Sequence, residues 1–130
     1  MSTAMPANTY QPKGMLIDGK WVGSVSGAHF AVENPAKRKP ITDVPRAAEA
    51  DVNAAVAAAD KALPAWKKVV PRERGKLLLK IAEAIQARVE ELARTIALET
   101  GNALRTQARG EASMTADIFR YFGGLASELK

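Results

Sequence analysis

The stretch from Pro71 to Gly101 constrains the fold most, because its apolar residues recur at the period of an α-helix. Pro71 stands where the first turn of a helix tolerates proline, and Gly101 can supply the left-handed stop. The pattern predicts a helix of about seven turns, with a bend or a division near 86–88 left open. Its stripe holds one polar residue among apolar ones: Arg74, Leu78, Ile81, Ile85, Val89, Leu92 and Ile96. Such a helix is a framework and not a catalytic site.

The composition narrows the classes of protein and of site. The chain has 130 residues, which allows one domain or part of a larger one. Its residues are 47% apolar but only 5% aromatic, which predicts a core of small side chains between closely packed helices. Cysteine is absent, which excludes disulfides, thiolate nucleophiles and cysteine-based zinc sites. We expect a cytoplasmic location, because this usage fits a reducing compartment.

Charge and hydropathy favour neither a membrane protein nor a secreted one. The net charge of +5 is scattered along the predicted helix faces, so it does not single out a nucleic acid or a membrane as partner. No run approaches the roughly 20 apolar residues of a membrane span. Residues 1–14 lack the positive start and apolar centre of a secretory signal, and we expect a mobile leader there.

The part of the chain before the helices predicts short strands. Met15–Val22 predicts a hairpin around Asp18-Gly19, a dipeptide that accepts the two positive φ angles of a type I′ turn. The following extended region predicts a strand at His29–Glu33 ended by Asn34-Pro35, a loop at 37–40 and a further strand at 41–44.

Two more helices are expected, one on each side of the Pro71 stretch. The first runs from Ala48 to Leu63, where Pro64 should end it, and Trp66 should pack against the helices. Its predicted buried stripe is Val52, Ala55, Val56, Ala59 and Leu63. Ala48 and Val70 stand where a capping side chain would be best, and each missing cap costs about 1 kcal/mol.

The last helix is expected from Ala103 to Leu129. Its predicted buried stripe is Leu104, Ala108, Glu111, Thr115, Ile118, Phe122, Leu125 and Leu129. Glu111 is the one carboxylate on that stripe, and a buried charge needs a partner. We favour a structural pairing, with an arginine outside this chain as a candidate, and leave a functional role of Glu111 open.

Two glycine patterns resemble nucleotide-binding motifs and are rejected. Gly14–Lys20 has the letters of a phosphate loop, but Trp21 replaces the magnesium-binding hydroxyl and no helix follows. Gly123-Gly124 follows no strand, so close helix packing explains it better than a dinucleotide site does.

Isolated polar residues receive ordinary structural interpretations. No oriented partner adjoins His29, the one histidine, so a strand histidine is expected rather than a base or a metal ligand. We expect turn or surface hydroxyls at Ser24, Ser26 and Ser113, a solvated turn at Lys37–Lys39, and an ion pair of Glu90 with Arg94.

The order of these segments resembles the N-terminal part of the NAD(P)-dependent aldehyde dehydrogenase superfamily. The resemblance covers Met15–Lys130 without a gap, and Lys37-Arg38 replaces the family's usual Thr-Gly. It is carried by LIDGKWV, Asn-Pro-Ala, ITDVPRA, ADVNAAVAAADKAL followed by Pro-Ala-Trp, PRERGKLLLKIAEAI, LETGN and RGEASMTADIFRYFGGLA.

The resemblance implies an α/β parent fold with a Rossmann-like cofactor domain. This chain would contribute short strands with a hairpin and then three long amphipathic helices, so that 15–130 form an incomplete N-terminal part of the cofactor-binding domain. The parent enzyme would be a homo-oligomer that oxidises an aldehyde to a carboxylic acid, with a thiolate as nucleophile and NAD or NADP as hydride acceptor.

The family's cysteine, glutamate base and nucleotide-binding glycines have no counterparts in these residues. We therefore assign no catalytic or cofactor-binding residue, and expect the chain alone to be inactive and to bind no cofactor. Its expected partner is the remainder of the enzyme polypeptide, not a nucleic acid or a membrane. The resemblance also implies a structural monovalent cation held by oxygen atoms of Val32, Glu33 and Glu99.

A second hypothesis is a stand-alone helical binding module with a basic surface. The apolar stripes separate the two hypotheses, because helices made to cover absent neighbours must leave apolar surface exposed. On the first hypothesis we expect the isolated chain to be poorly soluble or partly molten unless it pairs with itself.

Overall fold

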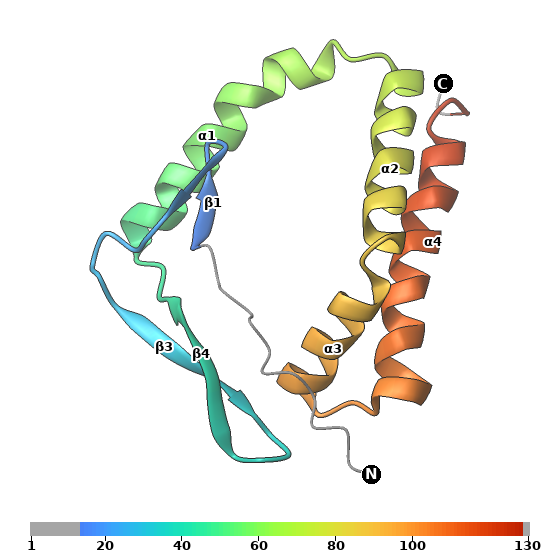
Figure 1. Cartoon of the computed structure of the whole chain (residues 1–130). Coiled ribbons are helices and arrows are strands. Elements are labelled where there is room, and N and C mark those ends of the chain that lie inside the picture. Colours follow the sequence, from blue (N-terminus) through green and yellow to red (C-terminus); the bar gives the residue numbers. More distant parts are fainter. Residues whose placement is uncertain (1–13, 129–130) are drawn as a thin grey trace.

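The computed structural model describes residues 14–128, which form two hairpins followed by helices. In chain order the elements are β1 (Met15–Ile17), β2 (Lys20–Val22), β3 (His29–Asn34), β4 (Lys39–Pro45), α1 (Glu49–Lys67), α2 (Pro71–Gln86), α3 (Val89–Thr100), the π-helical turn η1 (Leu104–Ala108) and α4 (Arg109–Leu125). They form an open arch, in which α1 and α2 meet at one corner and α2 lies beside α4 (Figure 1). The predicted leader lies almost entirely outside the described residues.

The first hairpin forms as predicted. β1 and β2 are antiparallel, with Met15 opposite Val22 and Ile17 opposite Lys20. Asp18 and Gly19 have φ angles of 49° and 74°, the two positive values that a type I′ turn requires. The sequence therefore predicted both the strands and the turn type.

The second hairpin has a shorter loop than expected. β3 pairs with β4 in antiparallel fashion, and β4 begins at Lys39, two residues before the predicted strand. The side chain of Asn34 closes the turn, because its Oδ1 accepts hydrogen bonds from the amides of Ala36 at 3.0 Å and Lys37 at 3.2 Å. Arg38 completes the reversal with a φ of 53°. The turn thus needs fewer residues than the composition of the loop suggested.

The prediction that Pro64 ends the first helix is wrong. α1 continues through Pro64 to Lys67. Proline lacks one amide donor, and here the loss falls in the last turn, where it affects a single hydrogen bond. The end of α1 is held instead by Arg74 of α2, which donates to the carbonyl oxygens of Trp66 and Lys67.

The predicted buried stripe of α1 is also wrong for this chain. Its large members are exposed, with 53% of Val52, 55% of Val56 and 42% of Leu63 accessible to solvent. α1 packs on β1, and its apolar face meets no other layer within residues 14–128. The amphipathic pattern is genuine, but the surface that would cover it is not among the described residues.

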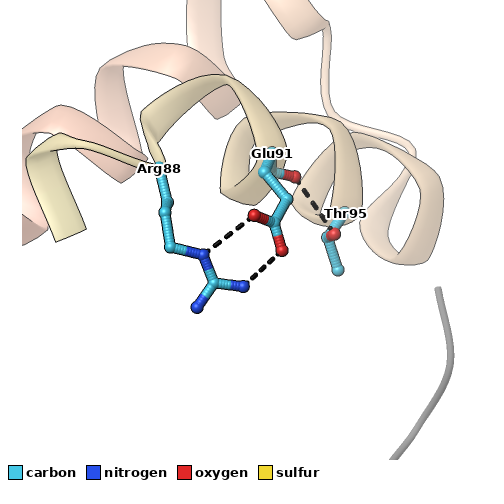
Figure 2. A network of polar contacts seen from close by, with 3 residues as sticks. All are labelled: Arg88, Glu91 and Thr95. Carbon is cyan, nitrogen blue, oxygen red and sulfur yellow. Dashed lines mark hydrogen bonds and ion pairs between the residues drawn. The ribbon is translucent and has the colours of Figure 1, made fainter. Parts of the chain in front are cut away.

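The Pro71–Gly101 stretch is divided at the position that the sequence left open. α2 ends at Gln86 and α3 begins at Val89, with Arg88 at φ −119° and ψ 18°, outside the helical region. Arg88 folds back onto Glu91 of α3, where its Nε donates to Oε2 at 2.8 Å and its Nη2 contacts Oε1 (Figure 2). This hydrogen-bonded ion pair raises the pKa of Arg88 and lowers that of Glu91.

The C-terminal end of α3 follows the prediction. Gly101 caps it in the left-handed conformation at φ 79°, and its amide donates to the carbonyl oxygen of Ala97. The hydroxyl of Thr95 donates to the carbonyl oxygen of Glu91 at 3.1 Å on the same helix (Figure 2).

The core consists of small side chains, as the composition predicted. Within residues 14–128 no large side chain is fully buried. α2 and α4 pack against each other in antiparallel fashion, and α3 packs on the first part of α4. The buried apolar residues are Ala82, Ala93, Ala108, Ala112, Ala116 and Ala126.

The predicted buried stripe of the last helix is right at its start, where Ala108 is buried and Leu104 packs on the core, but wrong beyond it. Of its large members, Ile118 is 49% exposed, Phe122 55% and Leu125 39%, and Leu129 lies outside the described residues. The buried face is Ala108, Ala112, Ala116, Gly123 and Ala126. Small side chains let two helix backbones approach closely, so α4 turns this face toward its neighbours and its large side chains point outward.

The start of the last helix differs from the prediction as well. Residues 104–108 form the π-helical turn η1, in which the amide of Ala108 donates to the carbonyl oxygen of Ala103 at 3.1 Å. None of the helices within residues 14–128 is long and apolar enough to cross a membrane.

Candidate functional site

An apolar groove lies at the corner of the arch. It has a volume of about 790 Å³ and is formed by Trp66 of α1, the first half of α2 and the end of α4. Leu77 of α2 and Phe122 of α4 both line it, and Arg74 is the one charged residue of the lining. A surface of this kind can bury apolar side chains of a partner, but its lining offers no acid, base or nucleophile for chemistry.

Asp51 ties the loop after β2 to the beginning of α1. Its carboxylate accepts hydrogen bonds from the amide of Ala48 at 2.8 Å, the amide of Val25 at 3.1 Å and the hydroxyl of Ser24 at 3.0 Å. These hydrogen bonds hold the pKa of Asp51 below its usual value, and the bond from Ala48 contributes most. Burial acts in the opposite direction. Asp51 is 3% exposed and fully paired, so we interpret it as a structural junction and not as a catalytic acid.

This junction modifies the prediction about the missing helix caps. The methyl group of Ala48 accepts no hydrogen bond, and Val70 provides no side-chain cap either, as expected. At α1, however, the third helical residue Asp51 reaches back to the amide of Ala48. The signal available in the sequence is the acidic Asp51 in the first turn, three residues after Ala48, where a carboxylate can reach back to the amide before the helix.

The predicted cation site lies where the end of β3 approaches the end of α3. The two elements are in contact, and a Cβ built on Gly101 would lie 3.1 Å from Cγ of Pro35. Val32 is half-buried, while Glu33 and Glu99 are exposed. The described residues contain no group of three or more His, Cys, Asp or Glu side chains that could hold a metal ion. The cation at Val32, Glu33 and Glu99 therefore stays a prediction.

The histidine and serine interpretations agree with the structure. His29 is exposed on β3, with its Nδ1 3.0 Å from the carbonyl oxygen of Gly27. Ser24 and Ser26 lie 2.9 Å apart through their hydroxyls and organise the turn before β3. Ser113 lies half-buried in α4, and Lys37–Lys39 are exposed at the β3–β4 turn.

The predicted environment of Glu111 is wrong. Glu111 is exposed and accepts hydrogen bonds from Nδ2 of Asn102, at 3.0 Å and 3.3 Å to its two carboxylate oxygens. Within the described residues its partner is therefore the side-chain amide of Asn102, and a pairing with an arginine outside this chain stays a prediction. The error arises because α4 buries the face that carries alanines, so that the neighbouring face with Glu111 is exposed.

The predicted partner of Glu90 is also wrong. Glu90 binds Arg109 of α4, with Nε to Oε1 at 2.5 Å and Nη2 to Oε2 at 3.0 Å, and not Arg94. The hydrogen bond from Arg109 lowers the pKa of Glu90, and the charges of Arg109 and Arg94 act in the same direction. The pair joins α3 to α4, a tertiary contact that sequence spacing could not indicate.

The two glycine patterns have structural roles in the described residues. Gly14–Lys20 forms the first hairpin and Gly123 packs against α2, so neither glycine pattern cradles a phosphate. This agrees with the rejection of both motifs from the sequence, and no step of a cofactor reaction can be derived from these side chains.

Known proteins resemble this chain over most or all of its length. The sequence profile of the "Aldehyde dehydrogenase family" matches residues 21–130. An aldehyde dehydrogenase of Aspergillus niger is 41% identical over 120 residues, which are 92% of this chain and 24% of that protein. The chain spans about a quarter of the length of the curated relatives it matches.

Solved structures give the same result. The crystal structure of PnpE from Pseudomonas sp. WBC-3 matches with a TM-score of 0.88 at 42% identity, over 92% of this chain and 25% of that one. An NAD-dependent aldehyde dehydrogenase from Sinorhizobium meliloti matches with a TM-score of 0.90 at 37% identity, over 100% of this chain and 26% of that one. The expected mixed α/β architecture is confirmed, and residues 14–128 hold four α-helices in place of three because the second is divided. The chain belongs to the aldehyde dehydrogenase family.

Proposed function

We propose that this chain serves as the N-terminal part of an NAD(P)-dependent aldehyde dehydrogenase, an oxidoreductase that converts an aldehyde to a carboxylic acid. The observation that carries the proposal is the match of the family profile to residues 21–130, together with the TM-score of 0.90 to the Sinorhizobium meliloti enzyme. That enzyme is described as NAD-dependent, which favours NAD over NADP as cofactor of the parent enzyme.

The chain's own contribution is structural. It contains no cysteine, so it cannot provide the thiolate on which the family's chemistry depends. Catalytic and cofactor-binding groups would come from polypeptide outside these 130 residues, and residues 15–130 would be part of the cofactor-binding domain. The exposed apolar face of α1 and the groove between α2 and α4 support this role, because both offer apolar surface to a neighbour.

A chimeric enzyme tests the proposal. The matching quarter of the Sinorhizobium meliloti enzyme is replaced by this chain, and NADH formation is measured with simple aldehydes. We expect NAD-dependent oxidation, with the unmodified enzyme as reference. A chimera that folds, by circular dichroism and gel filtration, yet oxidises no aldehyde would contradict the proposal.

The same assay on the 130-residue chain alone should show no turnover, because the thiol is missing. Turnover by the isolated chain would contradict the proposal that the catalytic groups lie outside these 130 residues. A homo-oligomeric parent enzyme and a cytoplasmic location stay predictions of the sequence and its resemblance.

The alternative of a stand-alone binding module is not supported by the comparisons. Lys37–Lys39, the one tight basic cluster of the sequence, occupies an exposed turn. Salt-dependent binding of this chain to DNA, seen as a shift in a binding assay, would be needed to support that hypothesis.

A further inference from the structure

The corner between α1 and α2 is bridged by one side chain. Arg74, in the first turn of α2, donates from Nε to the carbonyl oxygen of Val69 at 2.9 Å. Its Nη2 donates to the carbonyl oxygens of Trp66 at 3.2 Å and Lys67 at 3.1 Å. The guanidinium also lies over the indole ring of Trp66, 5.4 Å from the ring centre. One residue of α2 thus contacts both the backbone and the aromatic side chain at the end of α1.

These contacts answer a need that the sequence of α1 creates. The last carbonyl groups of a helix have no amide partner within it. α1 ends at Lys67, and the following Lys68 is in the right-handed helical conformation, without the left-handed glycine that closes α3. A guanidinium can serve several carbonyl oxygens at once through its planar fork of donors, and its charge suits the negative end of the helix dipole.

The position of α1 depends strongly on this corner. The described helices pack mainly as α2 with α4 and α3 with α4, whereas the main packing partner of α1 is the strand β1 (Figure 1). The segment 68–70 between the two helices is short, and it holds the amides of Lys68 and Val69, which donate to the carbonyl oxygens of Ala65 and Trp66. Besides β1 and the hydrogen bonds of Asp51 at its start, this segment is what orients α1 relative to α2.

We propose that Arg74 is a positioning residue, a latch that fixes the corner between α1 and α2. By holding Trp66 it also sets the end wall of the apolar groove, which the indole helps to form. The inference concerns the geometry of this chain and stands independently of the proposed aldehyde oxidation.

The test uses the full 130-residue chain with Trp21→Phe, so that Trp66 is the one tryptophan. Arg74→Gln removes the charge and most of the fork, Arg74→Lys keeps the charge without the fork, and Arg72→Gln is the matched control from the same turn, where Arg72 is exposed. Hydrogen exchange is measured for the amides of residues 65–69 and of α2 and α4, together with the emission maximum of Trp66.

We expect the amides at 65–69 to exchange about tenfold faster in Arg74→Gln, because hydrogen bonds from a charged group are lost. The emission of Trp66 should shift to the red, while exchange in α2 and α4 stays unchanged. Arg74→Lys should show a smaller local effect of the same kind, and Arg72→Gln should match the parent chain.

Three results would overturn the latch. Equal exchange in Arg74→Gln and Arg72→Gln would show that the contacts do not hold the corner. Faster exchange throughout α2 and α4 in Arg74→Lys would make Arg74 a general stability residue. An Arg74→Lys variant identical to the parent chain would show that charge suffices and that the forked contacts do not matter. If Arg74→Gln fails to fold, Arg74→Lys alone decides between these outcomes.

Discussion

Gly75 of α2 and Gly123 of α4 face each other with their backbones in contact. A Cβ on Gly75 would lie 2.6 Å from the carbonyl oxygen of Gly123, and one on Gly123 would lie 3.1 Å from the carbonyl oxygen of Gly75. Both residues are buried, and the side chain of Ala126 lies beside them. α2 and α4 therefore meet through backbone at this point, which explains why alanine dominates the core around them.

Gly75→Ala should destabilise the chain. The new methyl group meets a backbone oxygen that cannot move alone, and overpacking of this kind costs about 1–3 kcal/mol. Alanine also gains about 0.5–1 kcal/mol in a helix, so the net loss is somewhat smaller. Gly124→Ala is the control, because its Cβ would meet nothing within 4 Å and only the gain remains. Urea unfolding should lower the midpoint for Gly75→Ala and raise it for Gly124→Ala. Equal midpoints would contradict the close contact.

Gly101→Ala should destabilise the end of α3. Gly101 has a φ of 79°, and a Cβ there would also lie 3.1 Å from Cγ of Pro35. The left-handed conformation costs an L-residue other than glycine roughly 1–2 kcal/mol. Gly101→Asn separates the two causes, because asparagine accepts this conformation better but carries the same Cβ. Thermal unfolding should rank the parent chain first, Asn second and Ala last. An alanine variant as stable as the parent would refute the assignment.

Asp51→Asn should weaken the junction between the loop after β2 and α1 in a pH-dependent way. The folded pKa of Asp51 lies below its ordinary value of about 3.9. The carboxylate therefore contributes stability that is fully present above that value and is lost as the pH falls through the folded pKa.

The measurement is the urea midpoint of both proteins between about pH 2 and pH 6. The parent chain should be the more stable at the upper end, and the two curves should converge in acid. Asp60→Asn, an exposed position of the same helix, serves as control and should leave the profile unchanged. A constant difference between the parent chain and Asp51→Asn at every pH would show that the charge of Asp51 is not what the junction uses.

Phe122→Gln should improve the solubility of the isolated chain at little cost in stability. Phe122 is 55% exposed and stands on a wall of the groove, so the substitution removes apolar surface that favours self-association. Ala116→Leu should instead destabilise the chain, because Ala116 is 0% exposed in the core and extra volume there costs about 1–3 kcal/mol.

Light scattering at rising concentration and urea unfolding would measure the two effects. A strongly destabilised Phe122→Gln variant together with a stable Ala116→Leu variant would mean that the predicted stripe, and not the observed one, faces the core.

Local patterns gave correct predictions at two positions where the cause lies within a few residues. The type I′ turn at Asp18-Gly19 and the left-handed stop at Gly101 depend on neighbouring backbone preferences, and the break between α2 and α3 falls where the sequence left a division open. The structural interpretation of Gly123 was right for a related reason, since a glycine in a helical pattern has few uses besides close approach.

Predictions that required the direction of a helix face were less successful. Phe122 and Ile118 fall on an apolar stripe by periodicity, yet the adjacent face with Ala112 and Ala116 is the one buried. Periodicity cannot choose between two overlapping faces when the partner helix presents glycine at the contact. Glu111 is exposed for the same reason, because it lies outside the buried alanine face of α4.

The sequence by itself determined the type and approximate bounds of most elements and the family to which they belong, because hydrophobic period, turn residues and helix stops act locally. Tertiary structure decided which face of α4 is buried, that Glu90 binds Arg109, that Asp51 holds the loop before β3, and that Arg74 contacts the last carbonyl groups of α1. These contacts join residues that become neighbours only when whole helices and loops pack. The spacing of these residues in the sequence therefore does not predict the contacts.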